Sequence, residues 1–450
     1  MPTKLENHQR EQETMSCSKD YYNQNVKDKK NSNIIDVTKK SASRSFTKLP
    51  VSTRYQPGDV GWVAISTALV WIMIPGVGFF YSGMARNKNA LSLIMLCFLC
   101  IPVVSVQNGG AFIGDLRKAF FLNINDNPSP SSEGIPELAF AIYQGMFAAI
   151  TPALAIGAAA ERTRTIPLLI FIFIWSTLVY DVIACWCWSR HGWFSTLGGL
   201  DFAGGTPVHI TSGAAALAYC IVIGKRNGHG SDEFKPHNIA NVVLGTVLLW
   251  FGWFGFNGGS ALGANLRAIS AMTVSNLAAS IGGLTWMLMD YRLERKFSAL
   301  GFCSGAIAGL VCITPGSGYV TPVSSIAFGV CGGIACNLAV KLKHIFDFDD
   351  ALDVFAVHGV GGVTGNILTG IFAQRSVSLL GGSEIPIGGM LDGHHVQVAY
   401  QLASSVAGLG VDETELGEVA YYFVDKVKTS CQQKHDQKPV PMQTTNHYPK

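Results

Sequence analysis

The sequence predicts an all-α fold, a polytopic membrane protein built from packed helices. Its 450 residues are 48% hydrophobic and only 14% charged, whereas a soluble domain carries about 25% charged residues. From Gly61 onward, apolar stretches recur between short charged loops, and about 20 mostly apolar residues are needed to cross a bilayer. Glycines four residues apart, such as Gly301, Gly305 and Gly309, let neighbouring helices approach closely in lipid.

The first 58 residues stand apart from this apolar body. They contain 11 Lys or Arg and 6 Asp or Glu but almost no apolar run, so they cannot bury enough surface to offset the entropy lost on ordering. We expect residues 1–58 to form a disordered polar tail. Residues 59–410 then form the membrane domain, and residues 411–450 form a second tail.

Ten stretches of the membrane domain are candidate spans, and a further stretch at 396–410 is too short to cross. The ten lie at 61–84, 89–107, 136–159, 166–187, 204–224, 238–262, 268–289, 299–314, 318–340 and 351–373. If the first span enters from outside, the inward loops hold twelve Lys or Arg and the outward loops hold five. Because positive residues near span ends stay cytoplasmic, this bias predicts an outside N-terminus.

Two pairs of segments predict an internal repeat. The segment GVGFFYSGMARNKNALS (76–92) is similar to FGFNGGSALGANLRAIS (254–270), five spans later, and the same offset relates DFAGGTPVH to DVFAVHG. An odd number of spans gives the two halves opposite orientations. We therefore expect two inverted five-helix repeats, at 61–224 and 238–373, around a central pore.

Only two of the 11 histidines, His209 and His358, lie within candidate spans. Asp201 precedes His209 by eight residues, and Asp353 precedes His358 by five. Because the two helices enter from opposite faces, both imidazoles approach the middle of the bilayer. A lone buried histidine is often structural, but two related by a repeat favour a pathway. Two neutral rings can share a proton and bind a small polar guest, which suits a solute that can shed its charge.

Several other polar and aromatic residues leave two interpretations open. Asp201 could cap a helix or attract a cation, whereas Asp349 and Asp350 are expected to cap span ten. Three tryptophans gather at the outer end of span four: Trp186, Trp188 and Trp193. They could form an interfacial belt or a cation–π cup for a small ammonium ion.

The sequence carries no sign of enzyme chemistry. Neither a G-x-S-x-G nor an HExxH motif occurs in it. Nine of the eleven cysteines lie in or beside apolar spans, where small buried side chains are expected rather than metal ligands. We expect no metal, no cofactor and no nucleic-acid partner.

Five long segments resemble the Amt/Mep/Rh ammonium transporter family, and their residues are most similar to those of its fungal-type permeases. The resemblance covers residues 58–405, and the segments are GDVGWVAISTALVWIMIPGVGFFYSGMARNKN, YQGMFAAITPALAIGAAAERTR, DFAGGTPVHITSG, LWFGWFGFNGGSALGANLRA and DDALDVFAVHGVGGVTGNILTGIFA. It implies a homotrimer of eleven-span subunits in the plasma membrane, each with its own pore. The N-terminus would lie outside and the C-terminus in the cytoplasm.

The resemblance also assigns site residues by motif. Trp188, Phe147 and Ser260 resemble the outer site that recruits ammonium, and Asp201 resembles the aspartate that supports it. Phe147 and Phe256 resemble the stacked gate, while His209 and His358 resemble the twin pore histidines. The implied function is conduction of ammonium as ammonia plus a proton. The alternative is an ammonium sensor or a truncated paralogue that does not conduct.

The chain departs from the family pattern at two places. After Gln107 it jumps to NGGAFIGDL, which leaves span two shortened. After YQLASSVAG, which ends at Gly408, it passes within two residues to VDETELGEVAYYFVD, which leaves span eleven truncated. We expect these gaps to affect insertion and trimer packing more than the pore residues.

Overall fold

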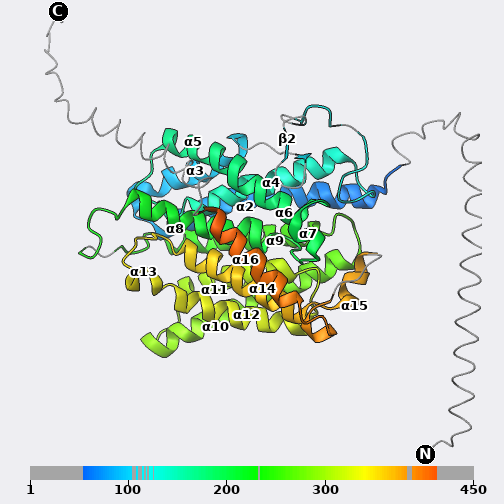
Figure 1. Ribbon diagram of the computed structural model, residues 1–450. Coiled ribbons are helices and arrows are strands. Elements are labelled where there is room, and N and C mark those ends of the chain that lie inside the picture. Colours follow the sequence, from blue (N-terminus) through cyan, green and yellow to red (C-terminus); the bar gives the residue numbers. More distant parts are fainter. Residues whose placement is uncertain are drawn as a thin grey trace, which may run out of the picture. The chain divides into compact units, whose positions relative to one another are not determined.

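The computed structural model describes residues 54–103, 108–109, 114–115, 118, 121–124, 126–231, 234–382 and 388–412. The predicted tails lie almost wholly outside these residues, since description begins at Arg54 and ends at Asp412. From Tyr55 onward the chain belongs to one unit, and the helices of that unit are shown in Figure 1.

Nine helical segments of the described chain are long and apolar enough to cross a membrane. Four are single helices: α2 (Pro57–Met84), α4 (Glu137–Ala155), α9 (Ile239–Gly259) and α10 (Leu266–Glu294). One is a chain of pieces: α5 (Thr165–Trp175), the π-helix η4 (Ser176–Tyr180), α6 (Asp181–Trp188) and α7 (Trp193–Leu197). The other four join two pieces each: η5 (Gly205–Ile210) with α8 (Thr211–Ile223), α11 (Ala299–Ile313) with η6 (Thr314–Gly316), α12 (Pro322–Ala339) with α13 (Leu342–Ile345), and η7 (Phe355–Val360) with α14 (Gly361–Phe372).

The helical class is thus confirmed, with nine spans rather than ten among the described residues. The predicted span at 89–107 is the exception. The short η2 (Asn87–Asn89) leads into α3 (Ala90–Val103), and the apolar helix Asn87–Ile101 is shorter than a span. Further on, two strands of two residues each, β1 (Asn108–Gly109) and β2 (Gly114–Asp115), pair antiparallel. The all-α prediction did not contain this pair.

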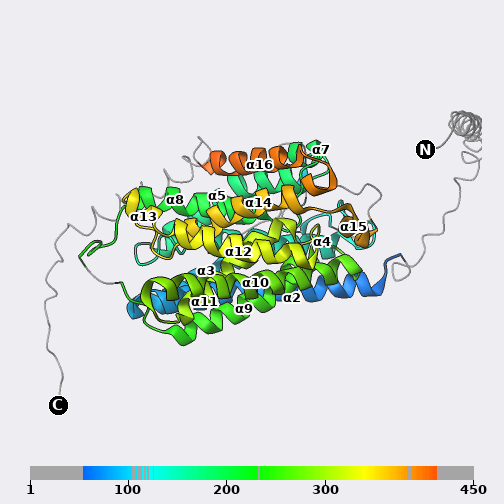
Figure 2. The same ribbon diagram turned by 90° about the horizontal axis from the view of Figure 1, so that it is seen from below.

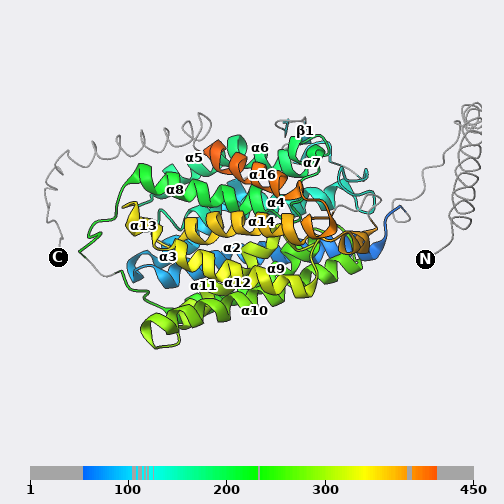
Figure 3. The same cartoon turned by 60° about the horizontal axis from the view of Figure 1, so that its bottom comes forward.

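Helices α9, α10, α11 and α12 pack side by side, and α2 lies along α9 (Figures 2 and 3). Small residues make this approach possible. A Cβ on Gly245 of α9 would overlap the backbone of Phe80 in α2, so only glycine fits there. Large apolar side chains such as Leu91, Val247 and Val323 remain exposed on the bundle, as expected for helices that face lipid.

The last described helix, α16 (Gln397–Asp412), lies against α14 (Figure 1). Its 16 residues span about 24 Å, less than a bilayer core of about 30 Å, which agrees with the predicted short stub. Polar side chains attach it to the bundle. Gln401 accepts a hydrogen bond from Leu200 N at 2.9 Å and donates to Leu200 O at 2.6 Å. Ser404 Oγ meets Thr206 Oγ1 at 2.8 Å. Three short helices lie between α14 and α16 in the described chain: α15 (Arg375–Ser378), η8 (Leu379–Gly381) and η9 (Met390–Asp392).

We predict that Gln401→Leu destabilises the protein by about 2–4 kcal/mol, because it leaves a buried donor and a buried acceptor of Leu200 without partners. Thermal unfolding of the purified protein in detergent measures the change. Val406→Ala, at an exposed position of the same helix, serves as the control. Equal unfolding temperatures for the two variants would show that polar contacts do not hold α16 in place.

Candidate functional site

Two short π-helical segments, η5 and η7, carry the two histidines named above. π-helical turns inside α-helices are rare and occur frequently at functional sites. An aspartate caps each segment. Asp201 Oδ1 accepts from Gly204 N at 2.7 Å and Gly205 N at 2.8 Å, and its Oδ2 accepts from Thr206 N at 2.8 Å. Both carboxylate oxygens of Asp201 therefore stabilise the start of η5.

The counterpart of Asp201 in the second half is Asp350, not Asp353. Asp350 Oδ2 accepts from Phe355 N at 2.8 Å, and Asp350 precedes His358 by eight residues, as Asp201 precedes His209. The expected capping by Asp350 is therefore correct. Asp353 instead has φ +60° and pairs with Lys343. The eight-residue spacing was present in the sequence and would have identified the right aspartate.

His209 and His358 meet in the interior. Their Nδ1 atoms lie 3.2 Å apart, and their side chains are 1% and 5% exposed. Because two facing nitrogens form one hydrogen bond only if one is protonated and the other is not, the neutral rings adopt opposite tautomers at this contact. His209 Nε2 has no hydrogen-bond partner among the described residues. The pair thus offers a buried polar position that a small guest can fill.

The close approach of η7 to α8 brings the rings together. A Cβ on Gly213 of α8 would overlap the backbone N and Cα of Gly359, the residue after His358. The two backbones therefore touch at a pair of glycines beside the histidines. No larger residue at position 213 leaves η7 in its place.

We predict that Gly213→Ala destabilises the fold by about 1–3 kcal/mol, because the added methyl group overpacks this crossing. Gly61→Ala in α2 is the matched control, since a Cβ there meets nothing within 4 Å and alanine is the better helix former. The free energy of unfolding in detergent separates the two. A Gly213 variant as stable as the Gly61 variant would contradict the close crossing.

The predicted aromatic residues gather on one side of the histidines. Phe147 stacks on Phe256 with ring centroids 4.2 Å apart, and Trp188 meets Phe147 edge-on at 5.8 Å. Phe256 in turn lies 6.1 Å from the His209 ring, centroid to centroid. Ser260 Oγ donates to Phe256 O at 2.9 Å. We call this the aromatic end of the bundle, defined by Trp188, Phe147 and Ser260.

Asp201 acts on this end through the backbone. Trp188 Nε1 donates to the Asp201 carbonyl oxygen at 3.0 Å, while the Asp201 carboxylate is occupied by the three amides described above. Of the two interpretations of Asp201, the geometry is that of a cap. The side chain positions η5, and the backbone carbonyl of the same residue positions the Trp188 ring.

Two contacts of the site were not anticipated from the sequence. Trp253 stacks on His209 with centroids 5.5 Å apart and donates to Thr314 Oγ1 at 3.0 Å. Asn366 Nδ2 donates to Thr206 Oγ1 at 2.9 Å, one turn from His209. Trp253 was seen only as part of an aromatic segment, and nothing in the spacing of Asn366 indicated a partner 160 residues away.

On the other side of the histidines a mostly apolar cavity follows. Its lining includes His358 and Trp253 as well as Tyr81, Trp286 and Asp353. Tyr81 donates to Leu154 O at 2.7 Å, which fixes its ring on the cavity wall. No motif or spacing in the sequence singles out Tyr81. The cavity extends from His358 to Asp353 in the loop that precedes η7.

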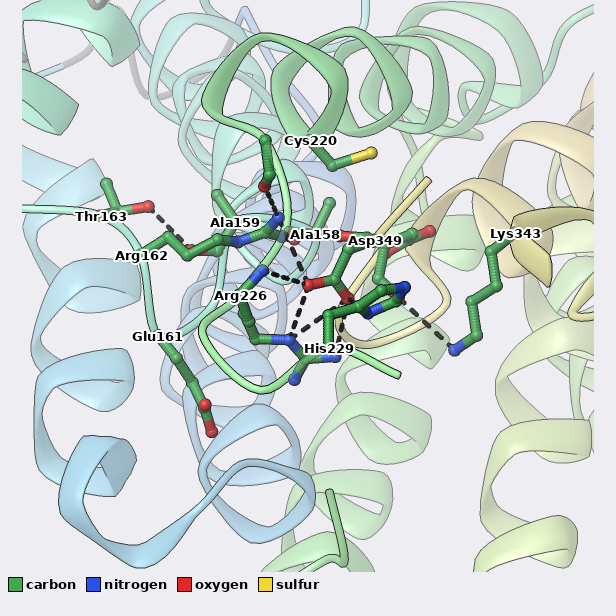
Figure 4. A network of polar contacts seen from close by, with 12 residues as sticks. Ala158, Ala159, Glu161, Arg162, Thr163, Cys220, Arg226, His229, Lys343 and Asp349 are labelled. Atoms are coloured by element: carbon green, nitrogen blue, oxygen red, sulfur yellow. Dashed lines mark hydrogen bonds and ion pairs between the residues drawn. The ribbon is translucent and has the colours of Figure 1, made fainter. Parts of the chain in front are cut away.

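A network of ion pairs covers that side of the bundle (Figure 4). Asp349, 1% exposed at its side chain, accepts from Arg226 Nη2 at 2.8 Å and lies 3.6 Å from Arg162 Nη1. Arg162 Nη2 also donates to the Asp349 carbonyl oxygen at 2.7 Å. Glu161 pairs with Arg86 nearby. We call this the ion-pair end of the bundle, defined by Arg162, Arg226 and Asp349.

The expectation that Asp349 caps span ten is therefore wrong. Burial alone would raise the pKa of Asp349, but hydrogen bonds and attraction from Arg226, with a contribution from Arg162, lower it to about 2. The two arginines come from loops far away in the sequence and take the carboxylate that a helix start would otherwise use. Among the described residues, no group of three or more His, Cys, Asp or Glu could hold a metal ion.

The comparisons with known proteins agree on one family. The model of the Ammonium Transporter Family matches residues 61–438. Ammonium transporter 1 of Schizosaccharomyces pombe is 48% identical over 415 residues, which cover 82% of this chain and 84% of that protein. Ammonium transporter MEP2 of Saccharomyces cerevisiae is 47% identical over 380 residues, covering 80% and 76%. The crystal structure of Saccharomyces cerevisiae Mep2 superposes with a TM-score of 0.77 at 45% identity, covering 84% of this chain and 86% of that one.

Proposed function

The chain belongs to the ammonium transporter family, and on that premise we propose that it carries ammonium through a twin-histidine pore in the plasma membrane. As a family member it is a multi-pass membrane transporter and not an enzyme. The observation that carries the proposal is the buried contact of His209 Nδ1 with His358 Nδ1 at 3.2 Å, beside a nitrogen that has no partner among the described residues.

Ammonium first binds at the aromatic end. Trp188 and Phe147 offer ring faces and edges to a small cation, and the Ser260 hydroxyl offers an oxygen acceptor. Asp201 orients the Trp188 ring through its carbonyl oxygen. The Phe147–Phe256 stack then acts as a gate, because a pair of rings 4.2 Å apart admits no hydrated ion.

Beyond the gate the solute moves without its charge. A bare ammonium ion in this dry interior would lose its water without gaining a counter-charge, so it gives up a proton and continues as ammonia. Ammonia can donate to or accept from the imidazoles of His209 and His358, which also provide a route for the proton. The solute then enters the cavity lined by His358 and Asp353, from which it would leave at the ion-pair end.

Orientation and assembly complete the proposal. The ion-pair end would face the cytoplasm, with the N-terminus outside and the C-terminal tail inside, because its loops carry most of the basic residues. The equal spacing of Asp201–His209 and Asp350–His358, each leading into a π-helical segment, supports inverted five-helix repeats. The exposed apolar helix faces would contact lipid and the neighbouring subunits of a homotrimer.

Uptake of methylammonium tests the proposed function. We expect cells that lack their own ammonium permeases to accumulate labelled methylammonium when they express the full chain, and ammonium to compete with it. Surface labelling of the same cells establishes that the protein has reached the plasma membrane. Absence of uptake by protein at the surface would reject conduction and favour the sensor alternative.

A further inference from the structure

The cavity beyond His358 ends at an ion pair that the proposed pathway does not use. Asp353 lines the cavity together with His358 and Tyr81. Its Oδ1 lies 2.6 Å from Lys343 Nζ, which also reaches the Asp350 carbonyl oxygen at 3.5 Å. Lys343 belongs to the four-residue α13 and appears at the edge of the network in Figure 4. A primary ammonium group therefore sits on a carboxylate of the cavity wall.

The charges around this carboxylate differ from those around its neighbours. Asp349 is shared by Arg162 and Arg226, and Asp347 pairs with Lys225 at 2.5 Å. Lys343 is the one cation within ion-pair distance of Asp353 in the described part of the chain. The second carboxylate here, Asp350, is 2% exposed, and its Oδ1 has no hydrogen-bond partner among the described residues. Without Lys343, no cation of the described residues would lie within ion-pair distance of Asp353.

Lysine and the proposed substrate present the same chemistry to a carboxylate. The Lys343 head group is a tetrahedral, positively charged nitrogen with three N–H donors, and ammonium and methylammonium have the same kind of nitrogen. Asp353 Oδ1 lies 2.6 Å from Lys343 Nζ but has no hydrogen-bond partner among the described residues, so it can accept a hydrogen bond from a free ammonium ion in the same position. The backbone also holds Asp353 firmly, since its φ of +60° is adopted only where surrounding structure requires it.

We infer that the Asp353 carboxylate is a binding site for ammonium at the end of the pore cavity, and that Lys343 occupies it as a tethered competitor. The inference rests on the proposed function, because it is the pore that delivers the solute to this cavity. Ammonia takes up here the proton that the imidazoles of His209 and His358 relay, and Asp353 holds the resulting ammonium ion until Lys343 returns and displaces it. The lysine thus keeps the exit from retaining the ion.

Ammonium-dependent thermal unfolding of the purified full chain tests this site. Lys343→Met removes the competing charge, and Lys341→Met is the control, since Lys341 adjoins the same short helix but is exposed. Unfolding temperatures are measured against ammonium chloride at constant ionic strength, with sodium chloride as the balancing salt. We expect Lys343→Met to reach half-maximal stabilisation at an ammonium concentration at least about tenfold lower than Lys341→Met does. The reason is that the tethered lysine, which only Lys343→Met lacks, competes at millimolar or higher effective concentration.

A second substitution identifies the carboxylate. Asp353→Asn in the Lys343→Met background removes the charge, and asparagine tolerates a positive φ, so the backbone need not change. We expect the tenfold gain to disappear. Equal ammonium dependence of the Lys343 and Lys341 variants, or a gain that survives Asp353→Asn, would overturn the inference. If Lys343→Met yields no folded protein, Lys343→Gln replaces it under the same criteria.

Uptake by the same proteins separates this inference from the proposed function. If the protein takes up methylammonium but the two lysine variants do not differ, only the ammonium site at Asp353 is rejected. If protein at the cell surface takes up no methylammonium, the proposed function itself is rejected. Lys343→Arg retains a cation on Asp353 and is expected to behave as the wild type in the unfolding assay.

Discussion

Replacing His358 by alanine is expected to lower methylammonium uptake at least about tenfold, because it leaves a buried imidazole nitrogen without its partner, a loss worth about 1–3 kcal/mol. The partner is His209 Nδ1, 3.2 Å away, and both residues are buried. Since His209 Nε2 already has no partner among the described residues, the substitution leaves His209 with no protein group at either nitrogen. Initial uptake rates, normalised to protein at the cell surface, measure the effect.

A histidine outside the pore provides the control for this experiment. His344 lies on α13 and is exposed, so His344→Ala removes an imidazole of the same size without touching the pair. We expect it to transport at the wild-type rate. Uptake by His358→Ala within twofold of His344→Ala would mean that the solute does not pass between the two rings.

Replacing Asp349 by asparagine is expected to cause the largest loss of stability, about 3–5 kcal/mol, because it leaves buried positive charge without its counter-charge. Arg226 and Arg162 are 8% and 9% exposed at their side chains, and Asp349 is the carboxylate that both contact. Asp347→Asn is the matched control. Asp347 lies two residues away and pairs with Lys225, but its side chain is 77% exposed, and exposed pairs contribute little.

The pH dependence of the same pair of variants carries a definite sign. The pKa of Asp349 lies at about 2, below its ordinary 3.8, so its contribution to stability is complete above the unfolded value. It is lost as the pH falls through the folded value. The stability difference between the wild type and Asp349→Asn should therefore stay constant from neutral pH down to about pH 5 and shrink toward pH 2. A difference that grows on acidification would contradict the arginine contacts.

The sequence predicted the parts of this molecule that follow from local composition. Apolar length placed the spans, as in the predicted 351–373 against the observed Phe355–Phe372. Intramembrane polarity singled out His209 and His358 because a titratable group in an apolar helix requires an explanation. The motif resemblance then supplied Trp188, Phe147, Phe256 and Ser260, and the structure places these side chains in one row that leads to His209. Their roles remain those proposed above.

What the sequence did not supply are partners distant along the chain. Asp349 was expected to cap the helix that follows it, but it binds two arginines that lie 123 and 187 residues away in the sequence. No pattern of neighbouring residues indicates contacts over such separations. The short stretch at 396–410 was expected from its length alone to be too short to cross. Its attachment depends on Gln401, Ser404 and Ser405, which lower the hydropathy of α16 while each forms a specific hydrogen bond. A polar residue on a packing face lowers the mean hydropathy of a helix even when its hydrogen bond stabilises the helix contact.

The stack of Phe147 on Phe256 has a consequence for the rate of the proposed transport. Rings 4.2 Å apart leave no gap for a solute, so on the proposed pathway each passage would require a ring to swing aside about its Cα–Cβ bond. Both side chains are 1% exposed, and a densely packed interior resists such rotation. The rate of each cycle is then governed by an activated rearrangement of the protein rather than by diffusion. Throughput should level off as external solute accumulates and should rise steeply on warming, as it does for a carrier and not for a water-filled channel.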